Sequence, residues 1–146
     1  GGTWESSDPN IATITNNGLV TALEPGTVTF IFNSDSACSS DPSADLIIDP
    51  EPNVGFDGPS DICIGSTTEL SPNTGGIWDS SDPSIATITN DGIVTGIAGG
   101  TVYFTFTSNT TGCSKQTDTN LNVYENPTIE ISGFLFLEIS AESISI

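Results

Sequence analysis

Short runs of alternating β-branched and polar residues recur along the chain, with turn signals between them. Residues 11–15 and 85–89 alternate with a period of two, which is typical of half-buried strands. An Asn-Gly and an Asp-Gly dipeptide follow these runs and favour two-residue hairpin turns, because both central positions need a positive φ. No segment keeps a period of 3.6 residues, so the pattern predicts strands and almost no helix.

Return strands are expected at residues 19–23 and 93–97, and a further strand follows each of them at residues 27–32 and 102–106. Val and Phe occupy alternate positions in these last strands, so one face of each should point into a core. The residues expected there are Val28, Phe30 and Phe32 in the first strand, and Val102, Phe104 and Phe106 in the second.

Residues 1–32 and 75–106 are nearly the same text at an offset of 74, with 21 of 32 positions identical. Self-similarity at a fixed period indicates an array in which one structural unit is built repeatedly. The period is longer than a solenoid repeat and fits a small β-sandwich module. Tandem copying suits reach, stiffness and multivalent attachment better than it suits catalysis.

A tryptophan stands just before Ser-Ser-Asp-Pro in both copies, at Trp4 and Trp78. The simplest interpretation is a core anchor under each sandwich, and an exposed platform for sugar stacking is the alternative. The Ser-Ser-Asp-Pro sequence itself predicts a turn, in which Asp8 and Asp82 bind nearby backbone N–H groups.

The repeated motif is Trp-x-Ser-Ser-Asp-Pro-x-Ile-Ala-Thr-Ile-Thr-Asn-x-Gly-x-Val-Thr followed by Gly-Thr-Val, at residues 4–28 and 78–102. It resembles the bacterial immunoglobulin-like domain, group 2, whose preceding Gly-x-Thr-x-x-Leu signature is matched at residues 65–70. The resemblance implies an all-β, immunoglobulin-like fold. The additional cysteines resemble repeats in very large surface adhesins of gliding Bacteroidota-type bacteria, which implies an extracellular place on a bacterial surface.

In the register of that family the chain holds one complete and two partial tandem β-sandwiches. Residues 1–49 supply the later strands of one module, residues 53–124 form a complete module, and residues 128–146 read as the first strands of another. Pro-containing joints are expected at residues 50–52 and 125–127.

Two explanations for the partial modules remain open. The sequence can be a window cut across the module borders of a longer array. Alternatively, residues 128–146 of one molecule complete residues 1–49 of the next in a head-to-tail fibre, because a donated strand repairs an unpaired edge and an open core. Residues 134–146 are the most apolar stretch, and under either explanation we expect this stretch to be buried in a sandwich.

The chain carries 19 acidic residues against one base, Lys115, and its net charge is −18. This balance argues against nucleic acid and anionic membranes as partners, because nothing neutralises phosphates. No apolar run is long enough to span a membrane, and no signal peptide is visible, so any targeting segment is expected upstream. Abundant Thr, Ser, Asn, Gly and Pro resemble the composition of secreted modules.

Histidine is absent, which removes Ser/His and Cys/His catalytic pairs and imidazole zinc sites. The acids lie mostly in predicted turns, so we expect no enzyme, no catalytic residue and no cofactor. Calcium is the one credible ion, since it takes carboxylate oxygens. Its weak candidates are Asp45, Asp49, Glu51 and Asp57 around the first joint, but the second joint has no matching cluster, so solvated acids are the favoured interpretation.

The three cysteines are Cys38, Cys63 and Cys113. Cys38 and Cys113 are equivalent by repeat, whereas Cys63 belongs to the early strands. A Cys63–Cys113 bridge within one module is the obvious pairing, but an odd number of up-and-down strands places the two at opposite ends. A bridge from Cys63 to a Cys38- or Cys113-type cysteine of the following module or molecule avoids that problem. Free thiols are the third alternative, and the pairing stays open.

Two weak glycosylation candidates stand in predicted loops: Asn109 in an Asn-Thr-Thr sequon and Ser36 in an Asp-Ser-Ala motif. The sequence as a whole predicts a structural repeat that provides spacing, stiffness and display, with identical modules or chains as end-to-end partners. The alternatives are a fibre subunit that polymerises by strand exchange, and an immunoglobulin-like module that binds carbohydrate or another surface.

Overall fold

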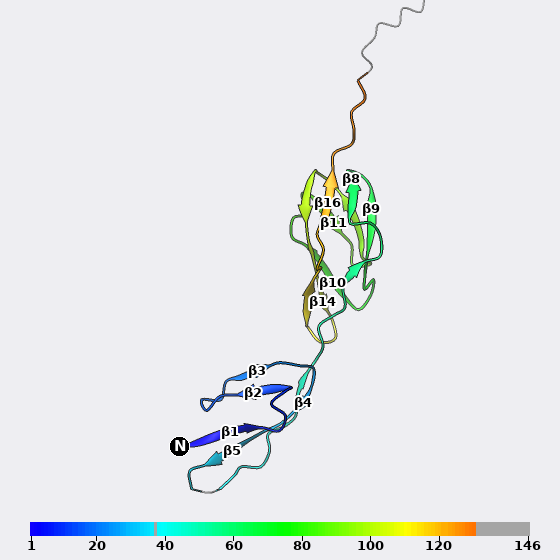
Figure 1. Ribbon diagram of the computed structural model, residues 1–146. Coiled ribbons are helices and arrows are strands. Elements are labelled where there is room, and N and C mark those ends of the chain that lie inside the picture. The colour runs from blue at the N-terminus through cyan, green and yellow to red at the C-terminus, as the bar shows by residue number, and fades with distance from the viewer. Residues whose placement is uncertain (37, 131–146) are drawn as a thin grey trace, which may run out of the picture.

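The computed structural model describes residues 1–36 and 38–130, and all regular elements in this part are β-strands. Two bodies follow one another along the chain (Figure 1). Residues 1–49, here called the half-module, contain β1 (Gly2–Ser6), β2 (Ala12–Ile14), β3 (Val20–Ala22), β4 (Gly26–Val28), β5 (Phe30–Ser34) and β6 (Leu46–Ile48). Residues 53–124, the complete module, contain β7 (Gly55–Phe56), β8 (Asp61–Cys63), β9 (Thr67–Ser71), β10 (Gly76–Ser80), β11 (Ala86–Ile88), β12 (Ile93–Gly96), β13 (Gly100–Val102), β14 (Phe104–Ser108), β15 (Ser114–Gln116) and β16 (Leu121–Tyr124).

The complete module is a two-layer sandwich. One layer has the strand order β11-β12-β9-β7, and the other consists of the sheets β10-β14-β15 and β13-β16-β8. Only Tyr103 separates β13 from β14, so these two sheets adjoin. Both layers contribute to one core, made of Ile62, Leu70, Trp78, Ala86, Val94, Val102, Phe104, Phe106, Leu121 and Val123. The predicted all-β sandwich is confirmed, as is the core face of the strand at residues 102–106.

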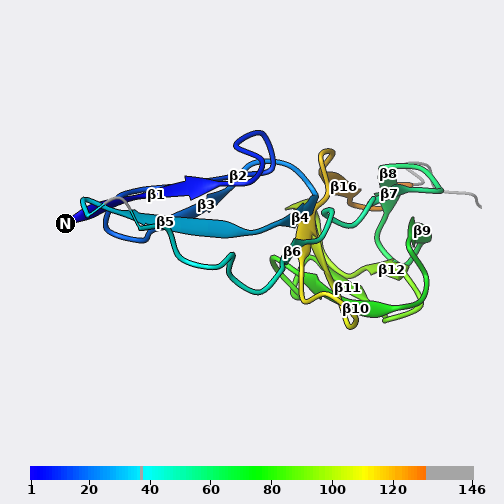
Figure 2. The same cartoon turned by 90° about the horizontal axis from the view of Figure 1, so that it is seen from below.

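The half-module repeats the backbone of the complete module. Trp4 pairs with Phe32 on β1 and β5, as Trp78 pairs with Phe106 on β10 and β14, and both pairs of rings have centroids 5.1 Å apart. Figure 2 shows β1 and β5 side by side along the half-module. The duplicated text therefore encodes the same paired strands twice.

Within the described residues, the half-module has no counterparts of β7, β8 and β9. β3 therefore pairs only with β2, and β6 pairs only with β4. Leu46 of β6 is 39% exposed, whereas its counterpart Leu121 is fully buried. Phe32 is only half-buried, although Phe106 lies in the core. The half-module is thus a sandwich with one side of its core uncovered.

The Ser-Ser-Asp-Pro turns form as predicted in both bodies. The Asp8 carboxylate accepts a hydrogen bond of 2.9 Å from the backbone N–H of Asn10, and the Asp82 carboxylate accepts one of 3.0 Å from that of Ser84. The hydroxyl of Ser84 also donates to Asp82, at 2.6 Å. The hydroxyl and the backbone N–H of Ser84 together hold the pKa of Asp82 below its ordinary value.

The segment expected to begin a third module lies mostly outside the described residues. Residues 128–130 are exposed, and residues 131–146 are not described, so the expected burial of the apolar stretch falls outside the structure. In the part of the chain that the structure covers, no helix is long and apolar enough to cross a membrane.

Candidate functional site

The two ends of the complete module are set by the direction of its strands. β15 and β16 both run antiparallel to the β13–β14 path, so the chain travels from the β14–β15 turn towards Tyr124. We call the end with residue 53 and the β14–β15 turn the proximal end, and the end where Tyr124 leaves the distal end. β8 runs parallel to β16 and pairs Cys63 with Tyr124, so Cys63 lies at the distal end.

At the proximal end the β14–β15 hairpin reaches the joint. The ammonium nitrogen of Lys115 lies 3.0 Å from a carboxylate oxygen of Glu51, and the side chains are 35% and 68% exposed. The hydrogen bond and the negative charge of Glu51 raise the pKa of Lys115, and Asp118 adds to the effect. The only basic side chain of the sequence is therefore paired with a joint residue.

At the distal end the side chains around Asp61 bond to one another. The Tyr124 hydroxyl and the Asn122 amide donate to the same oxygen of Asp61, at 3.2 and 3.0 Å. The negative charge of Asp61, together with this hydrogen bond, raises the pKa of Tyr124. The Asn126 amide donates to the carbonyl of Ile64 at 3.2 Å, so a residue of the second joint is tied back to the module it leaves.

All three cysteines lie within the described residues, and all are free thiols. The carbonyl of Cys38 accepts a hydrogen bond of 2.9 Å from the Ser34 N–H, and that of Cys113 accepts one of 3.0 Å from the Ser108 N–H. The two cysteines thus occupy the same place in their modules, next to the turn at the proximal end. Cys63 lies at the opposite end of its module and is exposed.

The calcium candidates are not gathered into one site. The Glu51 carboxylate is engaged by Lys115, and the Asp57 carboxylate accepts a hydrogen bond of 3.1 Å from the Ser71 hydroxyl. Asp45 and Asp49 are exposed. Among residues 1–36 and 38–130, no three acidic or cysteine side chains come together in a way that could hold a metal ion.

The two tryptophans differ in burial. Trp78 is 4% exposed, and its indole nitrogen donates to the backbone carbonyl of Pro72 at 2.9 Å, so no ring face is offered to a sugar. Trp4 is half-buried, because within the described residues no counterpart of β7, β8 or β9 covers it. The glycosylation candidates Asn109 and Ser36 are both exposed, in the β14–β15 turn and in the loop after β5 respectively.

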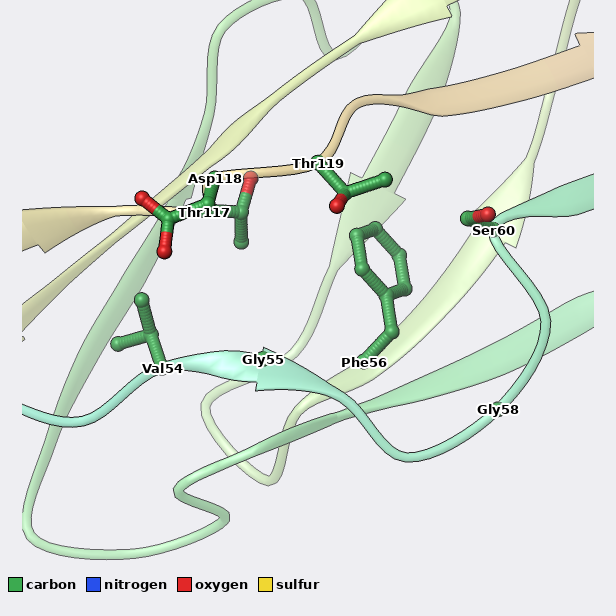
Figure 3. A pocket seen from close by; sticks show the side chains of 8 residues that line it. All are labelled: Val54, Gly55, Phe56, Gly58, Ser60, Thr117, Asp118 and Thr119. Carbon is green, nitrogen blue, oxygen red and sulfur yellow. The ribbon is translucent and has the colours of Figure 1, made fainter.

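A pocket of about 290 Å³ opens between β7 and the segment that precedes β16 (Figure 3). The ring of Phe56 stands in it opposite Thr119, and Asp118 is its only ionisable side chain. The Thr117 hydroxyl accepts a hydrogen bond of 3.3 Å from the buried Phe104 N–H, so this group serves the fold. Sequence analysis missed the pocket because its walls are contributed by the first and last segments of the module, and neither segment carries a motif.

Comparison with known proteins identifies the family. Residues 2–37 and 66–119 match the family model of the bacterial Ig-like domain (group 2). The chain belongs to this family. Both matched stretches of Ig-like domain contain the Trp-to-Gly-Thr-Val motif, and the second extends over β9 to β15 of the complete module.

This Ig-like chain is 29% identical over 136 residues to Ice-binding protein 1 of Shewanella frigidimarina (strain NCIMB 400), a match that covers 83% of this chain and 14% of that protein. Among solved structures it is similar to the C-terminal 282-residue fragment of intimin in complex with the intimin-binding domain of its translocated receptor. The TM-score is 0.50 at 16% identity, and the match covers 84% of this chain and 51% of that chain. This similarity concerns the fold alone. Domains 1–6 of the surface layer protein SbsC match with a TM-score of 0.34 at 18% identity, over 88% of this chain and 20% of that one.

Proposed function

We propose that this chain is a structural repeat of a bacterial surface fibre or adhesin, in which Ig-like sandwiches follow one another end to end. Its role is mechanical: the modules provide spacing, stiffness and display, and they carry out no reaction. The observation that carries this proposal is the duplicated sandwich together with its strand direction, because the chain enters the complete module at one end and leaves it at the other. Neighbouring modules are its principal partners.

Contacts at both joints support a stiff array. Lys115 holds Glu51 at the proximal end, and Asn126 holds Ile64 at the distal end. Pro52 and Pro127 fix φ in the two joints and shorten the freely rotating chain. An exposed pair such as Lys115–Glu51 contributes little to stability, so we assign to it the orientation of the hairpin on the joint rather than cohesion.

The charge of the chain supports an exposed extracellular position. A net charge of −18 keeps neighbouring copies apart and soluble. The acids are spread over turns of both modules, and within the described residues they neither gather around an ion nor pair as an acid and base in a pocket. Solvated carboxylates on the flanks of a spacer are the simplest role for them.

The test of this function is the length added per module. We define the duplicated chain as residues 1–124 followed by residues 50–146, so that the complete module occurs twice and each copy is preceded by the joint that contains Glu51. Small-angle X-ray scattering should show the maximum dimension growing by about 35–40 Å per added module, because the extended β15–β16 path from Cys113 to Tyr124 runs from one end of the module to the other. A further duplication should add the same increment. Modules that fold back on each other, with little or irregular growth, would contradict the proposal.

A second candidate function is favoured by the open side of the half-module. A pocket of about 370 Å³ lies between the ends of β3 and β6, lined by Leu23 and Ile48 among others. The same place in the complete module is filled by β8, where a Cβ added at Gly96 would lie 3.3 Å from Ile62. We propose as this second function that residues 128–146 of another copy add strands here, which would make the chain a self-polymerising subunit.

Sedimentation analysis separates the two candidates. If strand exchange operates, the full chain forms head-to-tail oligomers that grow with concentration, whereas a chain ending at residue 127 stays monomeric. Leu46, which is 39% exposed on the open side and corresponds to the buried Leu121, provides the matched variant: Leu46→Lys should block growth of the full chain. A full chain that remains monomeric at every concentration would rule out polymerisation by strand exchange, and the structural repeat would be the remaining candidate.

A further inference from the structure

The cysteines are spread along the molecule and cannot reach one another within it. Cys63 pairs with Tyr124, and Cys113 lies 11 residues before Tyr124 on the β15–β16 path. At about 3.3 Å per extended residue these two cysteines are on the order of 30 Å apart, far beyond the ~7 Å between Cα atoms that a disulfide allows. Cys38 lies close to Gly1, because the Ser34 N–H donates to the Cys38 carbonyl and the next N–H, that of Asp35, donates to the Gly1 carbonyl. Figure 1 shows this N-terminal end of the half-module on the side away from the complete module.

Register shows which place of the preceding module Cys113 approaches. Leu46 and Leu121 are equivalent, since they pair with Val28 and Val102, so Asp49 corresponds to Tyr124. A β8-type strand completing the half-module would therefore carry its Cys63-type cysteine beside Asp49. Asp49 stands two residues before Glu51.

The complete module reaches the same joint from the other side. Lys115 contacts Glu51, and Cys113 stands two residues nearer the hairpin turn than Lys115. The distal-end cysteine position of one module and the proximal-end cysteine position of the next thus face the same joint. The Lys115–Glu51 contact holds the hairpin that carries Cys113 against this joint, so both cysteine positions lie beside it.

We infer that consecutive modules are joined by a disulfide across each joint, from the Cys63 position of one module to the Cys113 position of the next. The inference rests on the proposed end-to-end array. Cys63 of this chain would then bond the proximal-end cysteine of the module that follows residue 127, and Cys113 the distal-end cysteine of the module that contains residues 1–49. A covalent chain of this kind prevents neighbouring modules from separating or rotating under tension.

The bridge forms by thiol–disulfide exchange with a disulfide oxidant, which is oxidised glutathione in the tests below. One cysteine thiolate attacks the oxidant and releases one glutathione thiol. The second cysteine thiolate attacks the mixed disulfide, forms the S–S bond between modules and releases the second glutathione. Two electrons pass from the protein sulfurs to the oxidant, and the two protons go to the released thiols. Cys63 is exposed and Cys113 half-buried, so both are accessible to the reagent.

The unaltered chain provides the first test. Treated with oxidised glutathione, its monomer should contain no Cys63–Cys113 bridge and no bridge to Cys38, because their partners belong to other modules. Mass spectrometry of non-reduced peptides should find the three cysteines as thiols or glutathione adducts. A Cys63–Cys113 peptide from the monomer would overturn the inference.

The duplicated chain provides the decisive test, with three variants that each retain two cysteines and carry serine at the others. The adjacent pair retains Cys63 of the first copy and Cys113 of the second. One control retains both cysteines of the first copy, and the other retains Cys113 of the first copy with Cys63 of the second. In the adjacent-pair variant, oxidised glutathione should drive formation of a disulfide between the two retained cysteines, so that neither thiol can be titrated afterwards. Both controls should acquire glutathione on each cysteine.

Small-angle X-ray scattering from the three reduced variants checks that all of them are folded before their bridges are compared. If all three give the same constant increment per module and the adjacent pair fails to close, the bridge is wrong while the array stands. If a control closes as readily as the adjacent pair, the bridge is also wrong. If the increment itself is absent, the array fails and the bridge with it.

Discussion

The indole nitrogen of Trp78 donates a hydrogen bond of 2.9 Å to the backbone carbonyl of Pro72. This bond ties β10 to the segment that follows β9, so it joins the two layers of the sandwich. Trp4 has the equivalent neighbour on its own sheet, Phe32, but no described residue takes the place of Pro72 beside it. The two tryptophans therefore have the same local sequence, but only Trp78 is covered by a segment from the opposite layer.

Trp78→Ala should lower the free energy of unfolding of the complete module by about 3–5 kcal/mol, through lost burial and an empty volume in the core. Trp4→Ala should cost the half-module clearly less, because Trp4 is only half-buried. Urea unfolding followed by the methyl signals of Val102 and Val28 measures each module separately. Equal losses in the two modules would contradict the different burial.

A single backbone oxygen makes Gly92 irreplaceable. Gly92 has φ +80°, and a Cβ added there would lie 2.1 Å from the carbonyl oxygen of Leu70. Gly75 has nearly the same φ, +84°, and nothing within 4 Å. Gly75→Ala should cost about 1 kcal/mol for the left-handed conformation. Gly92→Ala should cost several times as much, because the β9 backbone must move as well, and thermal unfolding of the pair measures the difference.

The Thr117 hydroxyl is the acceptor for the buried N–H of Phe104, at 3.3 Å. Thr117→Val keeps the shape of the side chain but leaves this N–H unpaired, which should destabilise the complete module by about 1–3 kcal/mol. The exposed neighbour Thr119 is the matched control, and Thr119→Val should change the free energy of unfolding little. If both variants unfold at the same urea concentration as the parent chain, the hydrogen bond does not contribute to the stability of the module.

Lys115 gives a direct readout of the first joint, since it is the only lysine. Glu51 raises its pKa, so Glu51→Gln should move that pKa down towards the ordinary value of about 10.4. The folded-state pKa is the higher one, so the stabilisation by the pair is complete below the unfolded pKa and is lost as pH rises through the folded pKa. The ¹³C shift of the lysine ε-carbon measures the titration.

Glu125→Gln is the control for this titration, because Glu125 belongs to the other joint. It should leave the midpoint unchanged. An unchanged midpoint in Glu51→Gln as well would mean that the hairpin does not hold the joint in solution.

Much of the fold could be predicted because the same sequence pattern occurs twice in the chain. Alternation at residues 85–89 and 102–106 and the tryptophan motif each specify local structure that neighbouring strands then keep. The turn at Asp91-Gly92 forms, but the expected two-residue hairpin is wrong: Thr89 bonds to Ile93, so the loop is residues 90–92. The pocket beside Phe56 could not be predicted, since it depends on how the chain passes from β7 in one layer to β8 in the other. The Lys115–Glu51 contact joins residues 64 positions apart, and neither residue belongs to a motif.

The cysteines show the same limit. Repeat position made Cys38 and Cys113 equivalent, and counting strands suggested that Cys63 lies at the other end. Which partner lies across a joint depends on how the β14–β15 hairpin approaches Glu51, and that depends on a three-dimensional contact. Spacing alone left three pairings open for this reason.

The central claim is that residues 53–124 form a closed sandwich while residues 1–49 form the same structure with one side uncovered. Residue-resolved hydrogen exchange on the full chain tests it with matched amides. The N–H groups of Ala12 and Ala86 both donate to the carbonyl of an Asp in the Ser-Ser-Asp-Pro turn, at 3.1 and 3.2 Å, and both alanines are fully buried. We predict that Ala86 exchanges at least about a hundredfold more slowly than Ala12, because only its module is closed by β7, β8 and β9. Equal exchange of the two amides would contradict the account.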